Sequence, residues 1–123
     1  MSAYIVAPCR SPVAPRGGAL SHLTLHDLGA PILRAALSQA GVQRDVVDEV
    51  IVSNALGAGG NPARIIALAA GLPKRIAGLS IDRQCAGGLD ALLLASQMIR
   101  SGNADVVVAG GVESYSRRPV RIQ

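Results

Sequence analysis

The sequence predicts an α/β fold with a mostly parallel sheet, and three observations support this prediction. Strand-like and helix-like segments alternate along the 123 residues in the order β-α-β-α-β-α-β. The run ADVVVAGG at 104–111 is continuously apolar, which is typical of a strand buried on both faces. The predicted helices also carry capping residues at their ends. This pattern favours parallel strands joined by right-handed helical crossovers.

The first predicted strand and helix lie in the N-terminal third of the chain. Residues 3–8 (AYIVAP) predict a buried strand, and a loop rich in Pro and Gly follows it. Thr24 and Asp27 have the spacing of a capping box, and Gly41 is a left-handed cap for the helix that they begin. Pro31 falls inside this helix and predicts either a kink or a later start.

The later elements alternate regularly between strand and helix. Their predicted ranges are 46–53, 62–70, 77–82, 86–100 and 104–111. Asn61 followed by Pro62 is a typical helix start, because Asn caps the helix and Pro lacks only an N–H that would be unpaired. The residues after Gly111 show no periodicity.

Composition excludes several classes of function. The net charge of +4 comes from Arg and Lys residues that are dispersed, apart from Arg117, Arg118 and Arg121, and no aromatic residues interleave them. Nucleic-acid binding is therefore not expected. No signal peptide or apolar run of about 20 residues is visible, so we expect a cytoplasmic protein with no membrane partner. Cys9 and Cys85 are far apart, which disfavours a disulfide framework and a zinc site.

Two motifs have simpler explanations than ligand binding. The loop GAGGNP at 57–62 follows a strand and precedes a helix, but Pro62 stands where a dinucleotide-binding fingerprint needs its third Gly. A tight turn before a capped helix is favoured. His22 and His26 can share a helix face, but a metal site needs more ligands than nearby Asp27 supplies, so no metal is expected.

Two polar residues follow the last predicted strand. Glu113 and Ser114 lie where α/β proteins place their sites, just beyond the carboxyl end of a strand. A catalytic role and a structural role in the loop are both compatible with these residues. The sequence leaves this choice open.

Cys85 is the candidate site that the sequence supports best. It lies at the N-terminus of the predicted helix at 86–100, where unpaired N–H groups and the helix dipole favour a thiolate. Gly87 and Gly88 leave room for a substrate to approach the backbone, and the Cys85 N–H is a candidate donor to a developing oxyanion. The alternative is a buried cysteine that acts as a small apolar side chain.

The helix at 86–100 is apolar around most of its circumference. Its polar residues are confined to a stripe that includes Asp90 and Gln97. One apolar side can pack on the sheet of this chain, but the other predicts a further covering layer. We therefore expect this helix to lie in the middle of a larger stack.

Several stretches occur in a specific order around Cys85, among them VDEVIVSNAL, NPARIIALAAGLP and DRQCAGGLDALLLASQMIRSGNADVVVAGGVES. In order and spacing the chain resembles the N-terminal part of the thiolase family, the acyl-CoA C-acyltransferases. The resemblance implies a partial thiolase-like layered α/β fold, in which the cysteine-bearing helix lies between two sheets. It also implies that residues 1–123 are a partial N-terminal thiolase domain, without the loop domain and the C-terminal domain.

The resemblance implies acyl transfer as the function. In that family the cysteine matching Cys85 is the nucleophile, which takes an acyl group from acyl-CoA or from a cleaved 3-oxoacyl-CoA as a thioester. The acyl group then passes to the carbanion of acetyl-CoA or to the thiol of CoA. The CoA thioester is the substrate, with no separate cofactor. The resemblance further implies a homo-oligomer or a complementing thiolase-fold chain, with residues 77–82 near the subunit contact.

The chain departs from the family pattern at four positions and in length. The family commonly has Asn at Asp82, Ser at Gly87, and Met at both Val112 and Tyr115. A carboxylate at Asp82 opposes thiolate formation unless it points away from the sulfur or pairs with Arg83. The family's catalytic His in a GHP motif and its second catalytic Cys are not among these residues. We therefore do not expect activity from this segment alone.

Two other functions compete with this interpretation. A non-catalytic module would dock on a thiolase-fold partner through its uncovered helix and its outer strand, because a large exposed apolar patch usually marks an interface. A ketoacyl synthase, which takes acyl groups from a carrier protein, would belong to the wider superfamily. The GGVES and NPAR stretches resemble thiolases more closely.

Overall fold

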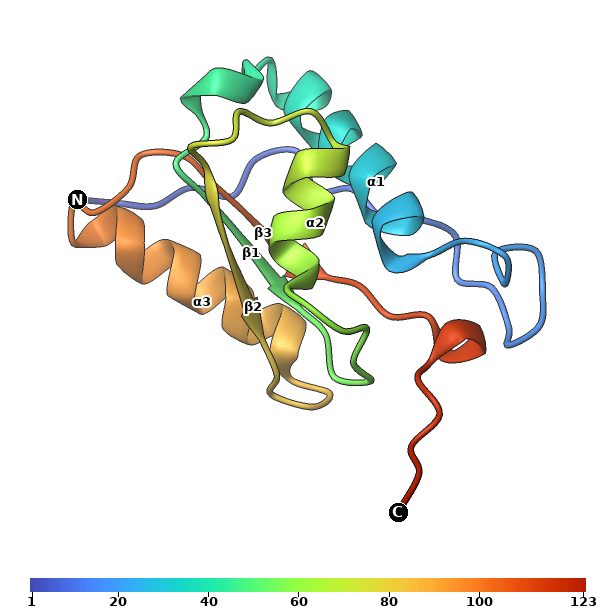
Figure 1. Cartoon of the computed structure of the whole chain (residues 1–123). Coiled ribbons are helices and arrows are strands. Elements are labelled where there is room, and N and C mark those ends of the chain that lie inside the picture. The colour runs from blue at the N-terminus through green and yellow to red at the C-terminus, as the bar shows by residue number, and fades with distance from the viewer.

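Three helices and three strands alternate along the chain, and the computed structural model describes all residues from 1 to 123 (Figure 1). Their order is α1 (Leu25–Ala40), β1 (Glu49–Ser53), α2 (Pro62–Ala69), β2 (Ala77–Ile81), α3 (Gly87–Arg100) and β3 (Val107–Gly111). Short 3₁₀ turns occupy Arg44–Val46 and Tyr115–Arg117. The strands form one parallel sheet in the order β2-β1-β3, which confirms the predicted α/β class.

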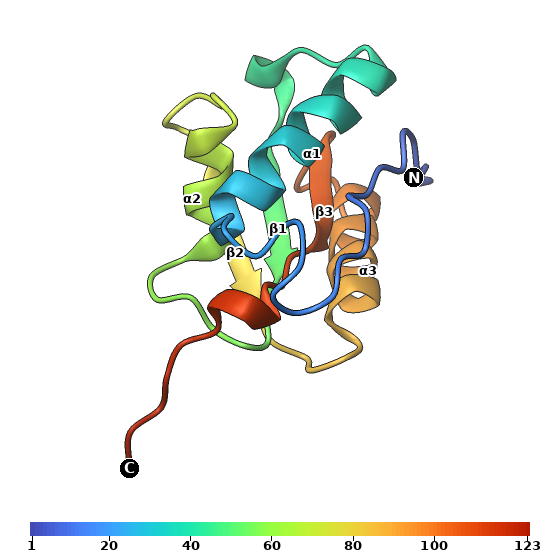
Figure 2. The same cartoon turned by 90° about the vertical axis from the view of Figure 1, so that its right-hand side faces the viewer.

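The helices cover the two faces of the sheet unequally. Figure 2 shows α1 and α2 on one face and α3 on the other. Side chains alternate across the central strand β1, so Val50 and Val52 join the core under α1 and α2. Ile51 points to the opposite face, where it packs against Ala91 and Ala95 of α3.

Both predicted helix starts are confirmed. The Thr24 side chain accepts the N–H of Asp27, and the Asp27 carboxylate accepts the N–H of Thr24, which completes the capping box. Gly41 ends α1 in the left-handed conformation, at φ 68°. Pro31 lies within α1, so the helix does not start later. The Asn61 side chain caps α2.

Residues 3–8 do not form a strand, and the prediction of a first buried strand is wrong. None of their backbone groups forms a hydrogen bond to the sheet, and Ala7 has a φ of 52° that interrupts the extended conformation. The side chains of Tyr4, Ile5 and Val6 are exposed. An apolar run with strand propensity fits a sheet only where a partner strand is available, and this segment finds none in the three-stranded sheet.

The central and last strands begin three residues later than predicted, at Glu49 and Val107. Before β1, residues Arg44–Val46 form a 3₁₀ turn. Before β3, the Asp48 carboxylate accepts the N–H groups of Asp105 at 2.7 Å and of Val106 at 3.0 Å. These N–H groups are therefore bound to a side chain instead of a neighbouring strand. The Asp48 carboxylate thus joins the starts of β1 and β3.

The Asp48 contacts predict a specific acid sensitivity. The N–H groups of Asp105 and Val106 stabilise the charged carboxylate and lower the pKa of Asp48 below its ordinary value of 3.8. A lowered pKa in the folded state contributes stability above the unfolded value, and this contribution is lost as the pH falls through the folded pKa. We expect the urea midpoint of Asp48→Asn to fall less than that of the parent chain between about pH 5 and about pH 2.

The matched control is Asp45→Asn, which removes a nearby exposed carboxylate that accepts no backbone N–H. This variant should keep the acid dependence of the parent chain. If lowering the pH reduces the urea midpoint equally in the parent chain and in Asp48→Asn, the hydrogen bonds from Asp105 and Val106 to Asp48 do not contribute to stability.

One face of α3 has no cover within this chain. Leu89, Leu92 and Leu93 are between 39% and 64% exposed, while Ala91 and Ala95 contact the sheet. The chain exposes 7702 Å², whereas a compact monomer of 12.5 kDa exposes about 6,200 Å². As predicted, the sheet therefore covers only one side of this apolar helix.

No helix of the structure combines the length and apolar character that crossing a bilayer requires.

Candidate functional site

The carboxyl ends of the three parallel strands lie along one edge of the sheet. Ser53 of β1 is in register with Ile81 of β2 and with Gly111 of β3, and all three residues end their strands. Cys85 follows β2 by four residues, and Glu113 follows β3 by two. The topology therefore brings the predicted site residues to the edge where α/β proteins place their sites.

Cys85 is an exposed free thiol at the start of α3. The N-cap residue, Ala86, has no side chain that can cap the helix. The N–H groups of Cys85, Gly88 and Leu89 have no hydrogen-bond acceptor within the chain. In this chain Cys85 is therefore not buried, and the free N–H groups leave the positive end of α3 open to an anion.

The loop that carries Cys85 has a tightly defined backbone. Gln84 adopts a φ of 52°, which is unusual for a residue with a side chain and costs about 1 kcal/mol. The Gln84 N–H donates to Asp82 Oδ1 at 2.9 Å, while the N–H of Ala86 donates to the Arg83 carbonyl at 3.1 Å. Strain of this kind is retained where surrounding contacts hold it, and it is common at functional sites.

The charged residues around Cys85 form one ion pair, which does not include Asp82. Arg83 donates from Nε to Oδ2 of Asp90 in α3 at 2.8 Å. This hydrogen bond, together with the charge of Asp90, raises the pKa of Arg83. Asp82 accepts the N–H of Gln84, so of the two arrangements left open for Asp82, the pair with Arg83 is not formed. Arg83 and Asp90 are the site residues that sequence reasoning missed as a pair.

The two glycines after Cys85 have different surroundings. Gly87 is buried, and a Cβ added there would lie 2.7 Å from Ser53 Cβ and closer still to Ser53 Oγ. Gly88 has open space around the position of a Cβ. Gly87 thus allows α3 to pack on the end of β1, whereas Gly88 has the room that an approaching ligand needs. Contact of either glycine with substrate stays a prediction.

Glu113 has a clear structural role. Its carboxylate accepts the N–H of Ala55 and, at 3.2 Å from Oε2, the N–H of Leu56. It thereby connects the segment after β3 with the loop after β1. Ser114 precedes the last 3₁₀ turn and makes no capping hydrogen bond with its side chain. The structure supports the loop-shaping alternative for Glu113 and assigns no contact to Ser114 that indicates catalysis.

The other predicted motifs lie away from Cys85 or form turns. The loop at 57–62 leads into the Asn61 cap of α2, with Gly57 at a φ of 86°. His26 lies in the first turn of α1, whereas His22 precedes the helix. No group of three or more His, Cys, Asp or Glu side chains is arranged to hold a metal ion.

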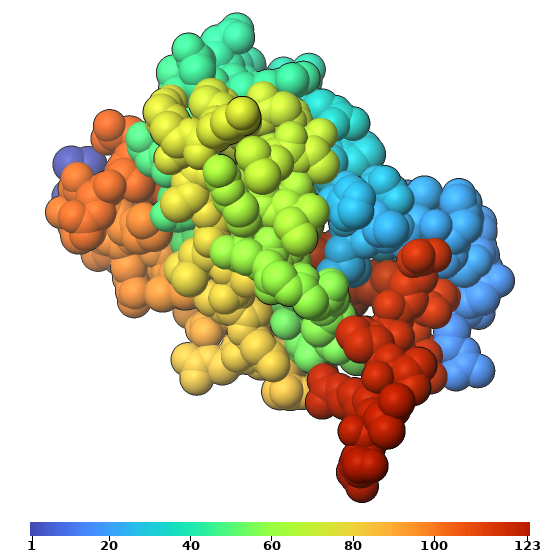
Figure 3. All heavy atoms as spheres, in the orientation of Figure 1, coloured from blue at the N-terminus to red at the C-terminus, as the bar shows by residue number.

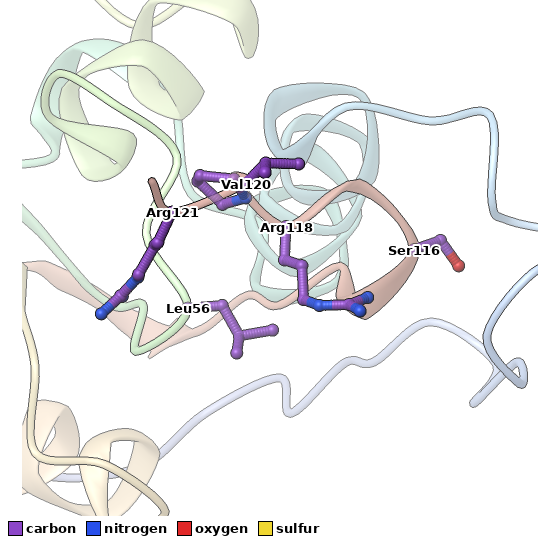
Figure 4. Close-up of a pocket in the computed structure, with 6 residues that line it drawn as sticks. Leu56, Ser116, Arg118, Val120 and Arg121 are labelled. Carbon is purple, nitrogen blue, oxygen red and sulfur yellow. The ribbon is translucent and has the colours of Figure 1, made fainter. Parts of the chain in front are cut away.

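A separate hollow of about 540 Å³ lies beside the C-terminal segment, which extends from the body of the molecule (Figure 3). Figure 4 shows the side chains of Arg118 and Arg121 on either side of Leu56 in this hollow. Arg118 also stacks on Tyr115, with 4.0 Å between its guanidinium carbon and the ring centroid. Cys85 does not line the hollow.

Fold and site together define a parallel α/β protein with an exposed cysteine before an uncapped helix, at the carboxyl edge of its sheet. Residues 3–123 match the thiolase N-terminal domain family. The chain belongs to the thiolase family.

Individual relatives agree with this assignment. The chain is 49% identical over 117 residues to a probable acetyl-CoA acetyltransferase of Mycolicibacterium smegmatis, and 42% identical over 118 residues to a cytosolic acetyl-CoA acetyltransferase of Gibberella zeae. Each match covers 94% of this chain and 30% of the relative. A crystal structure of the Bacillus anthracis acetyl-CoA acetyltransferase superimposes with a TM-score of 0.92 at 38% identity, covering 97% of this chain and 31% of that one. The chain thus spans about a third of the length of these relatives.

Proposed function

We propose that Cys85 is the acyl-accepting nucleophile of a thiolase-type acyltransferase. The observation that carries this proposal is the exposed thiol directly before an uncapped helix N-terminus, in a chain of the thiolase family. The free N–H groups of Gly88 and Leu89 favour negative charge near the start of α3. A thiolate is the reactive form of cysteine, so this environment supports a nucleophilic role.

The proposed reaction has two acyl-transfer steps. In the first, the Cys85 thiolate attacks the thioester carbonyl of acyl-CoA, and the negative charge moves to the carbonyl oxygen. Collapse of this intermediate expels the CoA thiolate, which takes a proton from a donor outside these residues, and leaves the acyl group on Cys85 as a thioester. In the second, a base outside these residues removes a proton from the thiol of CoA or from the α-carbon of acetyl-CoA. The resulting thiolate or carbanion attacks the acyl carbon, and the bond to sulfur breaks to release the Cys85 thiolate. The N–H of Cys85, which is free in this chain, is a candidate donor to the oxyanion.

The remaining catalytic groups are proposed to come from outside these residues. The relatives named above extend over about three times the length of this chain. We assign residues 1–123 to part of an N-terminal thiolase domain, and we propose that turnover needs the loop domain and the C-terminal domain. The uncovered Leu89, Leu92 and Leu93 face of α3 is suited to contact that remaining part. The Gibberella zeae relative is a cytosolic enzyme, which supports a cytoplasmic location for this chain.

The experiment is transfer of an acetyl group to Cys85. This chain is first combined with a fragment that supplies the rest of a thiolase. We then expect acetyl-CoA or acetoacetyl-CoA to add one acetyl group to Cys85. Mass spectrometry of the Cys85 peptide measures the product. Cys85→Ala should lose this label completely, because no other side chain at the helix N-terminus can form the thioester.

Cys9→Ser is the matched control, because it removes the other exposed thiol, which is hydrogen-bonded to Gln39 far along the chain from the site. This variant should keep the label on Cys85. A parent chain that binds the complementing fragment but never carries acetyl on Cys85 would contradict the proposal. Binding that is unchanged in Cys85→Ala would then favour the non-catalytic docking module.

A further inference from the structure

We propose that the Arg83–Asp90 ion pair positions the Cys85 thiol at the N-terminus of α3. The inference rests on the proposed nucleophilic role of Cys85. The pair joins the residue two positions before the cysteine to the first turn of the helix after it, with 2.8 Å between Arg83 Nε and Asp90 Oδ2. It is therefore a bridge across the segment that carries the sulfur.

Besides the pair, local hydrogen bonds hold the segment between these anchors. The Asp82 carboxylate accepts the N–H of Gln84. The N–H groups of Ala86 and Gly87 donate turn hydrogen bonds to the carbonyls of Arg83 and Gln84. Gln84 stays at a φ of 52°, a conformation that an unrestrained residue with a side chain leaves readily. No hydrogen bond fixes the Cys85 backbone N–H within the chain. The position of Cys85 therefore depends on contacts made by its neighbours.

The pair contributes little to overall stability, because the Arg83 side chain is 68% exposed and that of Asp90 is 27% exposed, so solvent screens the interaction. Its consequence is local. Asp90 is the acidic residue of the first turn of α3, so its bond to Arg83 fixes the loop relative to the free N–H groups of Gly88 and Leu89. These N–H groups stabilise a thiolate only if its sulfur is held near them.

Two opposite predictions separate positioning from a simple charge effect. If the pair positions Cys85, then Arg83→Gln and Asp90→Asn both break the bridge and both slow the reaction of the thiol. If Arg83 acts only through its positive charge, then Arg83→Gln slows the reaction, whereas Asp90→Asn removes a nearby negative charge and speeds it. The sign of the Asp90→Asn effect therefore decides between the two.

The measurement is the rate of alkylation of Cys85 by iodoacetamide, a neutral reagent, in the full chain under folding conditions. Cys9 serves as an internal reference, because it is exposed and lies outside the bridge. We expect each single variant to lower the Cys85 rate, relative to Cys9, by about two- to fivefold. The double variant should be no slower than either single variant, since the bridge can be lost only once.

Arg83→Lys keeps the charge and should recover part of the rate. Arg100→Gln, which removes an exposed Arg at the other end of α3, should leave the ratio unchanged. A faster Asp90→Asn, or unchanged ratios in both single variants, would overturn the positioning role while leaving the nucleophile proposal intact. A parent Cys85 that is no more reactive than Cys9 would also overturn this inference, whereas the nucleophile proposal is tested separately by the acetyl label on Cys85.

Discussion

Gly78→Ala is expected to be the most destabilising glycine substitution outside the site, by about 3 kcal/mol of unfolding free energy. Gly78 lies in β2, where its backbone contacts the first residues of α2. A Cβ there would lie 2.7 Å from Arg64 Cα and 2.8 Å from Ala63 C, and closer to Arg64 N. These are backbone atoms of a helix, which cannot rotate away as a side chain can. Urea denaturation followed by circular dichroism measures the change.

The same displacement should disturb a network of hydrogen bonds around the start of α2. The Asn61 side chain caps the helix through Arg64 and also donates to the Gly78 carbonyl at 2.8 Å. Gly110→Ala is the matched control, because Gly110 also lies in a strand of the sheet but has open space around a Cβ. It should change stability little. If both variants lose the same unfolding free energy, the close packing of α2 on β2 is not the cause of the destabilisation by Gly78→Ala.

Gly87→Ala is expected to destabilise the chain by about 1–3 kcal/mol, because it would force α3 away from β1. A Cβ at this buried position would lie 2.7 Å from Ser53 Cβ and closer to Ser53 Oγ. Ser53 is itself buried at the end of the central strand. The volume that a side chain at position 87 would need is occupied by Ser53.

A double-mutant cycle tests the Gly87 contact. In a Ser53→Gly background the nearest remaining atom of residue 53 is its Cα at 3.9 Å, so Gly87→Ala should cost much less there. Gly88→Ala is the adjacent control: its Cβ meets nothing within 4 Å, and replacement of a helical Gly should stabilise the chain by about 0.4–1 kcal/mol. Independent effects of Ser53→Gly and Gly87→Ala would contradict a direct contact.

Much of the fold was predictable because its signals are local. The Thr24–Asp27 capping box, the Asn61 cap and the left-handed Gly41 each satisfy backbone groups within a few residues, so the sequence alone indicates them. The apolar run at 104–111 likewise indicated a strand, although Asp48 delays its start to Val107. Residues 3–8 failed as a strand because pairing is not a local property.

The candidate site divides in the same way. The sequence by itself determined that Cys85 begins an apolar helix after a short strand, since residue order and periodicity are sufficient for that. Only the tertiary structure decided that Arg83 pairs with Asp90 and that Gly87 makes room for Ser53. Ser53 and Gly87 are 34 positions apart, and which side chain fills a shared volume depends on how the helix is placed on the sheet. Local patterns specify elements, whereas contacts between elements follow from packing.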